Sequence, residues 1–201
     1  MSASSAASSS TSSTGLLYKY PRSVPGSNVQ VVVARNIGRD REDLIYPQVL
    51  DGDVEELVIA NPKMTKFELK FCAGTTFSIF KILSKAPDLK VLYLRDVSYT
   101  VQSIQSLEVP DTFASLQELI IFNDRMLTGE MLGILLPKCP NLITLDVGMC
   151  LHIDTSVVNL IIKHNPKLRN LNTVGTRINR DEARQLFINA GRPVEVYSTW
   201  Y

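Results

Sequence analysis

The sequence predicts an α/β solenoid, with a parallel sheet on its concave side and helices on its convex side. Three observations predict this fold. A leucine-rich pattern recurs every 25 to 27 residues, a helix-like apolar pattern separates successive copies, and a proline stands shortly before most copies. The chain has 201 residues, of which 45% are hydrophobic and 20% charged. This size and composition indicate about one folded domain and exclude a wholly disordered chain.

The repeated pattern marks the strands. Five copies have an apolar residue at their first and fourth places, and four of the five have one at the sixth place. These copies begin at Met64, Leu89, Leu116, Leu142 and Leu168 and read MTKFELKFC, LKVLYLRDV, LQELIIFND, LITLDVGMC and LRNLNTVGT. A sixth, degraded copy is expected to begin at Val194. A period of roughly 20–29 residues with the pattern L-x-x-L-x-L is typical of leucine-rich repeats, so the sequence predicts about six of them.

The alternation within each copy predicts which side chains are buried. Successive side chains of a strand point to opposite faces. The fourth and sixth places should therefore face the core, while the third, fifth and seventh places point outward. In the fourth copy, we expect Leu145 to be buried and Asp146 to be exposed.

The segments between copies have apolar residues three and four apart, which is typical of helices. The expected helices lie around residues 77–83, 131–136, 157–162 and 183–187. Pro62, Pro87, Pro140 and Pro166 each stand two residues before a copy. Proline interrupts a helix and favours an extended residue before it, so each should end its helix ahead of the next strand. Strand and crossover helix in alternation build a parallel sheet.

Three regions are expected along the chain. Residues 1–22 are predicted to be a disordered tail, since positions 2–14 contain only Ser, Ala and Thr. Residues 23–62 should form an N-terminal cap with an irregular first repeat, including a strand at 29–33 and a helix around 50–58. Residues 63–201 carry the leucine-rich repeats. The absence of acidic residues before Asp40 is also typical of an organellar transit peptide, although a plain polar tail fits this stretch better because its first basic residue is Lys19.

Charge and cysteine content exclude several classes of function. The net charge of +1 argues against a nucleic-acid-binding protein. No apolar run approaches the ~20 residues of a membrane helix, and the first residues do not resemble a signal peptide. Three cysteines are too few for a disulfide framework, which favours reduced thiols in the cytoplasm or nucleus.

No catalytic or cofactor-binding pattern is present, so we expect neither an enzyme nor a cofactor. The sequence has no phosphate-binding glycine loop and no G-x-S-x-G motif. A zinc set could be drawn from Cys139, Cys150, His152 and His164, but these do not form the two close pairs of a zinc site. The repeat register explains both cysteines as small buried residues, and no metal is expected.

Residues 139–187 resemble the cysteine-containing leucine-rich repeat, the subtype common in F-box/LRR proteins with ribonuclease-inhibitor-like solenoids. The residues that match its pattern are Cys139, Leu142, Leu145, Val147, Cys150 and Ile153. The resemblance implies recruitment of a substrate to a ubiquitin ligase. Other copies depart at the ninth place, with Val97, Asp124 and Thr176 instead of cysteine, and residues 1–62 show no F-box.

The outward places of the strands predict a binding surface. The predicted partner-binding residues are Lys66, Glu68, Lys70, Val91, Tyr93, Arg95, Glu118, Ile120, Phe122, Asp146, Asn170 and Asn172. Thr144, Gly148 and Val174 complete the outward set. An apolar and aromatic centre with charged residues of both signs at its rim is the anatomy of a protein interface. The alternative is that a terminal segment of the same chain covers this centre.

Two functions follow from this surface. The first is a cytoplasmic or nuclear interaction module that binds a protein partner, acting as a substrate-recognition subunit or adaptor in ubiquitin ligation. The second is a mitochondrial or other organellar repeat protein that helps to assemble a larger complex. In both, the chain is expected to be a monomer or one subunit of a hetero-complex, with no nucleic acid or membrane as partner.

Overall fold

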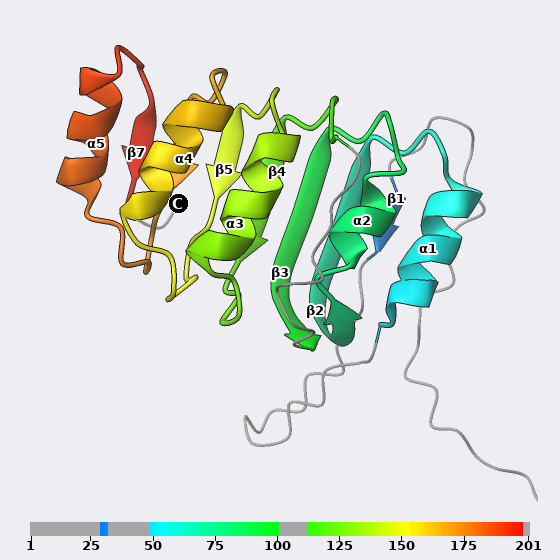
Figure 1. The fold of residues 1–201 in the computed structure, drawn as a ribbon. Helices are drawn as coiled ribbons and strands as arrows, with labels where there is room; N and C mark the ends of the chain where they lie inside the picture. Colours follow the sequence, from blue (N-terminus) through cyan, green and yellow to red (C-terminus); the bar gives the residue numbers. More distant parts are fainter. Residues whose placement is uncertain (1–28, 32–48, 101–111, 199–201) are drawn as a thin grey trace, which may run out of the picture.

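The computed structural model describes residues 29–31, 49–100 and 112–198, which form a sheet and a row of helices in two layers (Figure 1). The sheet contains β1 (Val29–Val31), β2 (Lys66–Thr76), β3 (Val91–Thr100), β4 (Glu118–Phe122), β5 (Thr144–Asp146), β6 (Asn170–Asn172) and β7 (Glu195–Tyr197). The helices are α1 (Asp51–Ala60), α2 (Ile79–Leu83), α3 (Gly129–Leu135), the 3-10 turn η2 (Leu136–Lys138), α4 (Ser156–His164) and α5 (Arg180–Asn189). All strand pairs are parallel and follow chain order. This arrangement confirms the predicted α/β leucine-rich repeat solenoid.

The two layers have different natural spacings, which fixes the concave side. Helices α1 to α5 all lie on one face of the sheet (Figure 1). Neighbouring strands are ~4.8 Å apart, whereas packed helices need ~8–10 Å. The helix layer is therefore the longer one, so the sheet lies on the inside of the curve. We call the sheet face turned away from the helices the concave face.

The register of the strands agrees with the repeat pattern. The fourth-place residues Phe67, Leu92, Leu119, Leu145 and Leu171 are successive partners across the sheet, and all are buried. The prediction for Leu145 is thus confirmed. The prediction for Asp146 is wrong, because this residue is half-buried. Its Oδ1 accepts from the Gly148 amide at 2.8 Å and its Oδ2 accepts from Asn172 Nδ2 at 3.0 Å.

The sixth repeat begins one residue earlier than predicted. Val196 pairs with Leu171 and is buried, so Val196 occupies the fourth place. The first place is then Pro193 and not Val194, and Tyr197 occupies the fifth place. β7 has one buried residue, so alternation alone could not fix its register.

Each of the first five repeats enters its strand through a hydrogen-bonded turn. The first-place amide donates to the carbonyl three residues earlier, as from Leu142 to Cys139 at 3.2 Å and from Leu168 to Asn165 at 3.1 Å. The proline follows the carbonyl residue directly, at the turn position that its fixed φ suits. In the third copy Leu116 donates to Phe113 at 3.2 Å in the same way, without a proline. The turn therefore belongs to the repeat, and proline only favours it.

Each of the first five repeats has a residue in the left-handed backbone conformation at its eighth place. The eighth-place residues with positive φ are Phe71 (56°), Asp96 (51°), Asn123 (56°), Met149 (62°) and Gly175 (68°). Asn123 and Met149 still use their amides in the sheet, donating to the Gly148 and Val174 carbonyls at 2.8 and 2.6 Å. Since most side chains other than glycine disfavour this conformation, its recurrence shows that the fold imposes it.

The N-terminal cap is described only in part. β1 pairs with β2 in parallel at Val29–Val31, and α1 follows at Asp51–Ala60, as the expected strand and helix of the cap require. Residues 32 and 33 of the expected strand and the expected tail at 1–22 lie outside the described residues. Within the described ranges, no helix is both long and apolar enough to cross a membrane.

Two glycines provide a matched test of the fold. Gly133 lies inside α3, where an added Cβ would rest 3.6 Å from Leu160 Cδ1. Gly133→Ala should raise the free energy of unfolding by ~0.5–1 kcal/mol, because alanine favours a helix and fits this space. Gly175→Ala should lower it by ~1 kcal/mol or more, because φ is +68° and the Cβ would collide with Met149. Urea denaturation measures both, and a neutral or stabilising Gly175→Ala would contradict the left-handed turn.

Candidate functional site

The outward places of the strands form three rows across the concave face. The rows are Lys66, Val91, Glu118, Thr144, Asn170 and Glu195 at the third place; Glu68, Tyr93, Ile120, Asp146, Asn172 and Tyr197 at the fifth; and Lys70, Arg95 and Phe122 at the seventh. All twelve predicted residues therefore lie in these rows, with Tyr93 and Ile120 as direct cross-strand partners. Their role in binding stays a prediction.

The half of this face formed by β5 and β6 is a network of polar side chains. Asn170 Nδ2 donates to Thr144 Oγ1 at 3.3 Å, and Asn172 Nδ2 donates to Asp146 Oδ2 at 3.0 Å. Asn172 Oδ1 also accepts from the Val174 amide at 3.1 Å. Each of these bonds fixes a side chain to its neighbour or to the backbone. The polar side chains of this half are thus already hydrogen-bonded to one another and to the backbone.

The half formed by β2, β3 and β4 contains an arginine–aromatic cluster, which consists of Phe71, Tyr93, Arg95 and Phe122. The Arg95 guanidinium carbon lies 5.1 Å from the centre of the Phe122 ring and 5.7 Å from that of Phe71. These distances suit cation–π contacts. Arg95 was predicted to lie at the charged rim, but the structure places it among the aromatic rings.

Phe71 is the residue of this cluster that the sequence did not predict. It occupies the eighth place, which strict alternation assigns to the core side. Its left-handed backbone, with φ of 56°, breaks the alternation and lets the ring reach Arg95 on the concave side. The signal was present in later copies, because Asn123 and Gly175 at the same place are residues that tolerate this conformation.

Phe122 depends on a glycine in the neighbouring strand segment. A Cβ on Gly148 would lie 2.8 Å from Phe122 Cε2 and 3.0 Å from its Cδ2. The ring therefore lies over the Gly148 α-carbon. Gly148 and Val174 were predicted to point outward, and both are buried. For Gly148 the cause is the Phe122 ring.

A lysine–glutamate triad, Lys66, Glu68 and Lys70, flanks the cluster on β2. The Lys66 ammonium lies 2.5 Å from one Glu68 oxygen, and the Lys70 ammonium lies 3.1 Å from the other. Lys70 Nζ is also 4.5 Å from the centre of the Tyr93 ring. Glu68 was expected at the exposed rim, but it is buried. Burial of this carboxylate is compatible with its two cationic partners.

The three cysteines lie in the hydrophobic core of the solenoid. Cys72, Cys139 and Cys150 are free thiols and fully buried, and burial raises the pKa of each to about 12. Cys150 Sγ donates to the Ile121 carbonyl at 3.1 Å, which links two repeats. Among the described residues, no three His, Cys, Asp or Glu side chains gather closely enough to hold a metal ion.

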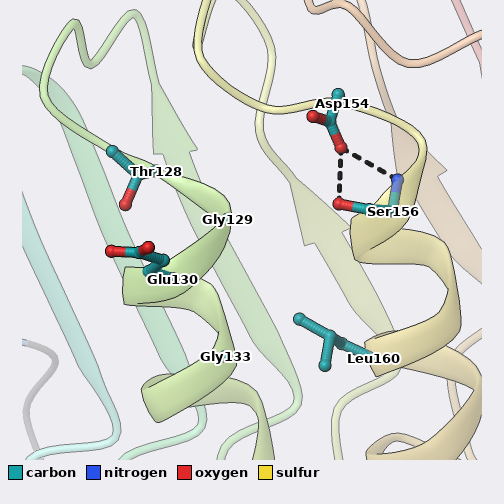
Figure 2. A pocket seen from close by; sticks show the side chains of 7 residues that line it. All are labelled: Thr128, Gly129, Glu130, Gly133, Asp154, Ser156 and Leu160. Carbon is teal, nitrogen blue, oxygen red and sulfur yellow. Dashed lines mark hydrogen bonds between the residues drawn. The ribbon is translucent and has the colours of Figure 1, made fainter.

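A groove of about 710 Å³ opens on the helix side, between the first turns of α3 and α4 (Figure 2). Gly129 and Gly133 leave it open, and Leu160 points toward Gly133. Asp154 accepts from the Ser156 amide at 2.9 Å and from its hydroxyl at 2.5 Å. This carboxylate therefore organises the start of α4, and the groove brings together no set of reactive side chains.

Comparisons with known proteins add little to the evidence that the strand topology gives for the fold. No protein-family model matches the chain, and no curated protein is similar to it in sequence. An internalin from Listeria monocytogenes is 11% identical over 77% of this chain and 39% of its own, with a TM-score of 0.48. A Bacteroides fragilis protein is 16% identical over 73% of this chain and 51% of its own, with a TM-score of 0.40. Likenesses this distant carry no argument about function, so the fold assignment rests on strand order and register.

Asp124 is a buried carboxylate at the ninth place, where Cys72 and Cys150 stand in other copies. Its Oδ1 accepts from the Met126 and Leu127 amides at 2.7 and 3.1 Å, while its Oδ2 is buried without a hydrogen-bond partner among the described residues. Burial raises the pKa of Asp124 to about 6, against the lowering effect of the two amides. The folded state therefore binds this proton more tightly than the unfolded state does.

Asp124 predicts an unusual dependence of stability on pH. Because its folded pKa of about 6 exceeds the unfolded value near ~3.9, its ionisation opposes folding above pH ~6 and ceases to do so below ~4. Asp124→Asn should be more stable than the wild type at pH 7, by ~1–3 kcal/mol, and this advantage should shrink as the pH falls to 5. Urea denaturation of both proteins measures it. A constant difference between pH 7 and pH 5 would contradict the assignment.

Proposed function

We propose that this chain is a protein–protein interaction module that binds its partner on the concave face. The observation that carries the proposal is the group of half-buried Tyr93, Ile120 and Phe122 on the neighbouring strands β3 and β4, with charged side chains around it. Aromatic residues at the centre and polar residues at the edge are typical of protein interfaces. Central aromatic residues commonly contribute most of the binding energy.

Within this class, we propose a substrate-recognition subunit or adaptor in ubiquitin ligation, acting in the cytoplasm or nucleus. The support is the resemblance of residues 139–187 to the cysteine-containing repeat of F-box/LRR proteins. Cys139 and Cys150 are buried between repeats, as that pattern requires.

The second candidate is an organellar repeat protein that aids the assembly of a larger complex. The acid-free start of the sequence favours it. The mature N-terminus of the protein isolated from cells distinguishes the two candidates. Loss of about the first 35 residues supports the organellar function, and an intact start supports the cytoplasmic or nuclear one.

Truncation of the central aromatic residues tests the proposed binding surface. Tyr93→Ala and Phe122→Ala should each weaken capture of the cellular partner by ~30-fold, the equivalent of ~2 kcal/mol. Arg95→Glu tests the same surface with little risk to the core, because Arg95 is exposed. Affinity purification with quantitative mass spectrometry compares each variant with the wild type.

Ile188→Ala is the control, since Ile188 is 66% exposed on α5, away from the concave face. The expected result is a protein lost from all three concave-face variants but kept by Ile188→Ala. Circular dichroism checks that each variant is folded. If the folded concave-face variants capture every partner as well as the wild type, the proposed surface is wrong. If Tyr93→Ala and Phe122→Ala unfold, the result for Arg95→Glu decides whether the proposed surface is correct.

A further inference from the structure

The part of the concave face formed by β2 and β3 presents cations more openly than anions, although the formal charges there nearly balance. On β2 and β3 the side chains of Lys66, Lys70 and Arg95 are 37%, 25% and 44% exposed. The acidic side chains paired with them are less accessible, at 5% for Glu68 and 13% for Asp96. A molecule that approaches this half therefore meets ammonium and guanidinium groups first.

Contacts with neighbouring side chains fix the position of Arg95. Its guanidinium lies between the rings of Phe71 and Phe122, and its Nε is 3.3 Å from Asp96 Oδ2. Asp96 is itself fixed by a hydrogen bond from Asn123 Nδ2. A side chain held in this way loses less freedom when it binds. The planar guanidinium matches the two oxygens of a carboxylate.

Glu118, the exposed acidic residue on β4, lies far along the strand direction from Lys70 and Arg95 at the seventh place. Glu118 occupies the third place of β4, four residues before Phe122. At ~3.3 Å per residue, that separation is ~13 Å along the strand, which exceeds the Debye length of ~8 Å at physiological salt. Glu118 therefore does little to screen Lys70 and Arg95 from a partner.

We propose that the half of the concave face formed by β2 to β4 binds an extended acidic segment of the partner protein. Arg95 receives one carboxylate between its two aromatic neighbours, and Lys66 and Lys70 contact others. This inference rests on the proposed function, because it names the partner chemistry for the same surface.

Designed peptides test this chemistry without knowledge of the partner. The probes are fluorescein-labelled peptides of equal length in which serine alternates with glutamate, glutamine or lysine, measured by fluorescence anisotropy with the full chain. The glutamate peptide should bind at least about tenfold tighter than the glutamine peptide, and the lysine peptide should not bind. The double variant Lys70→Gln/Arg95→Gln should lose this preference.

The control double variant Lys81→Gln/Lys163→Gln removes the same charge from exposed positions on α2 and α4. It should bind the glutamate peptide as the wild type does.

Equal losses in the two double variants, or equal binding of the glutamate and lysine peptides, would overturn the inference. So would an oligothymidylate of the same length that binds as tightly as the glutamate peptide, since the surface would then recognise phosphate. If the aromatic variants lose their cellular partner but the glutamate peptide shows no preference, only this inference fails and the proposed function stands.

Discussion

Each of the first five repeats has a residue in the left-handed backbone conformation at its eighth place, and the division between core and concave face depends on it. In a regular strand, burial of the fourth and sixth side chains would bury the eighth and expose the ninth. The positive φ at the eighth place reverses this order. Cys72, Val97, Asp124 and Cys150 at the ninth place are consequently buried. The same reversal brings the Phe71 ring to Arg95 on the opposite side.

The buried ninth place accepts different side chains because each meets the backbone in its own way. The Cys150 thiol donates to a carbonyl of the preceding repeat, whereas the Asp124 carboxylate accepts two amides of its own turn. The half-buried Thr176 bonds within its own repeat, since its hydroxyl donates to the Thr173 carbonyl and accepts from the Ile178 amide. Cysteine at this place is therefore one solution to a packing requirement. Asp124 meets the same requirement, but one of its oxygens has no hydrogen-bond partner among the described residues, and burial raises its pKa.

The sequence predicted the features that depend on local periodicity. The strands and helices, and the burial of Leu145, follow from alternation and apolar spacing within one repeat. The sequence did not predict contacts between side chains and backbone groups that belong to different repeats. Asp146 is held by Asn172, 26 residues later in the chain, and Arg192 donates to the Ile161 carbonyl at the end of α4, 31 residues earlier. Neither contact has a signature in the local sequence.

The candidate surface was predicted with the same limits. Its rows came directly from the repeat register, which placed Tyr93 beside Ile120 correctly. The charge distribution of this surface could not be predicted in the same way, because a count of charged residues does not show how deeply each side chain is buried. Glu68 is covered while its lysine partners stay accessible, and Arg95 sits among rings rather than at an edge. The preference for one sign of charge thus comes from burial and not from composition.

The backbone conformation at the eighth place tests the account most directly. In solution NMR, a residue with positive φ has an unusually short distance between its own amide and α protons, so it gives a strong intraresidue cross-peak. The account predicts this signal at Phe71, Asp96, Asn123 and Met149, together with backbone chemical shifts of the left-handed region. Extended conformations at these four residues would contradict it, because the ninth side chains would then point away from the core.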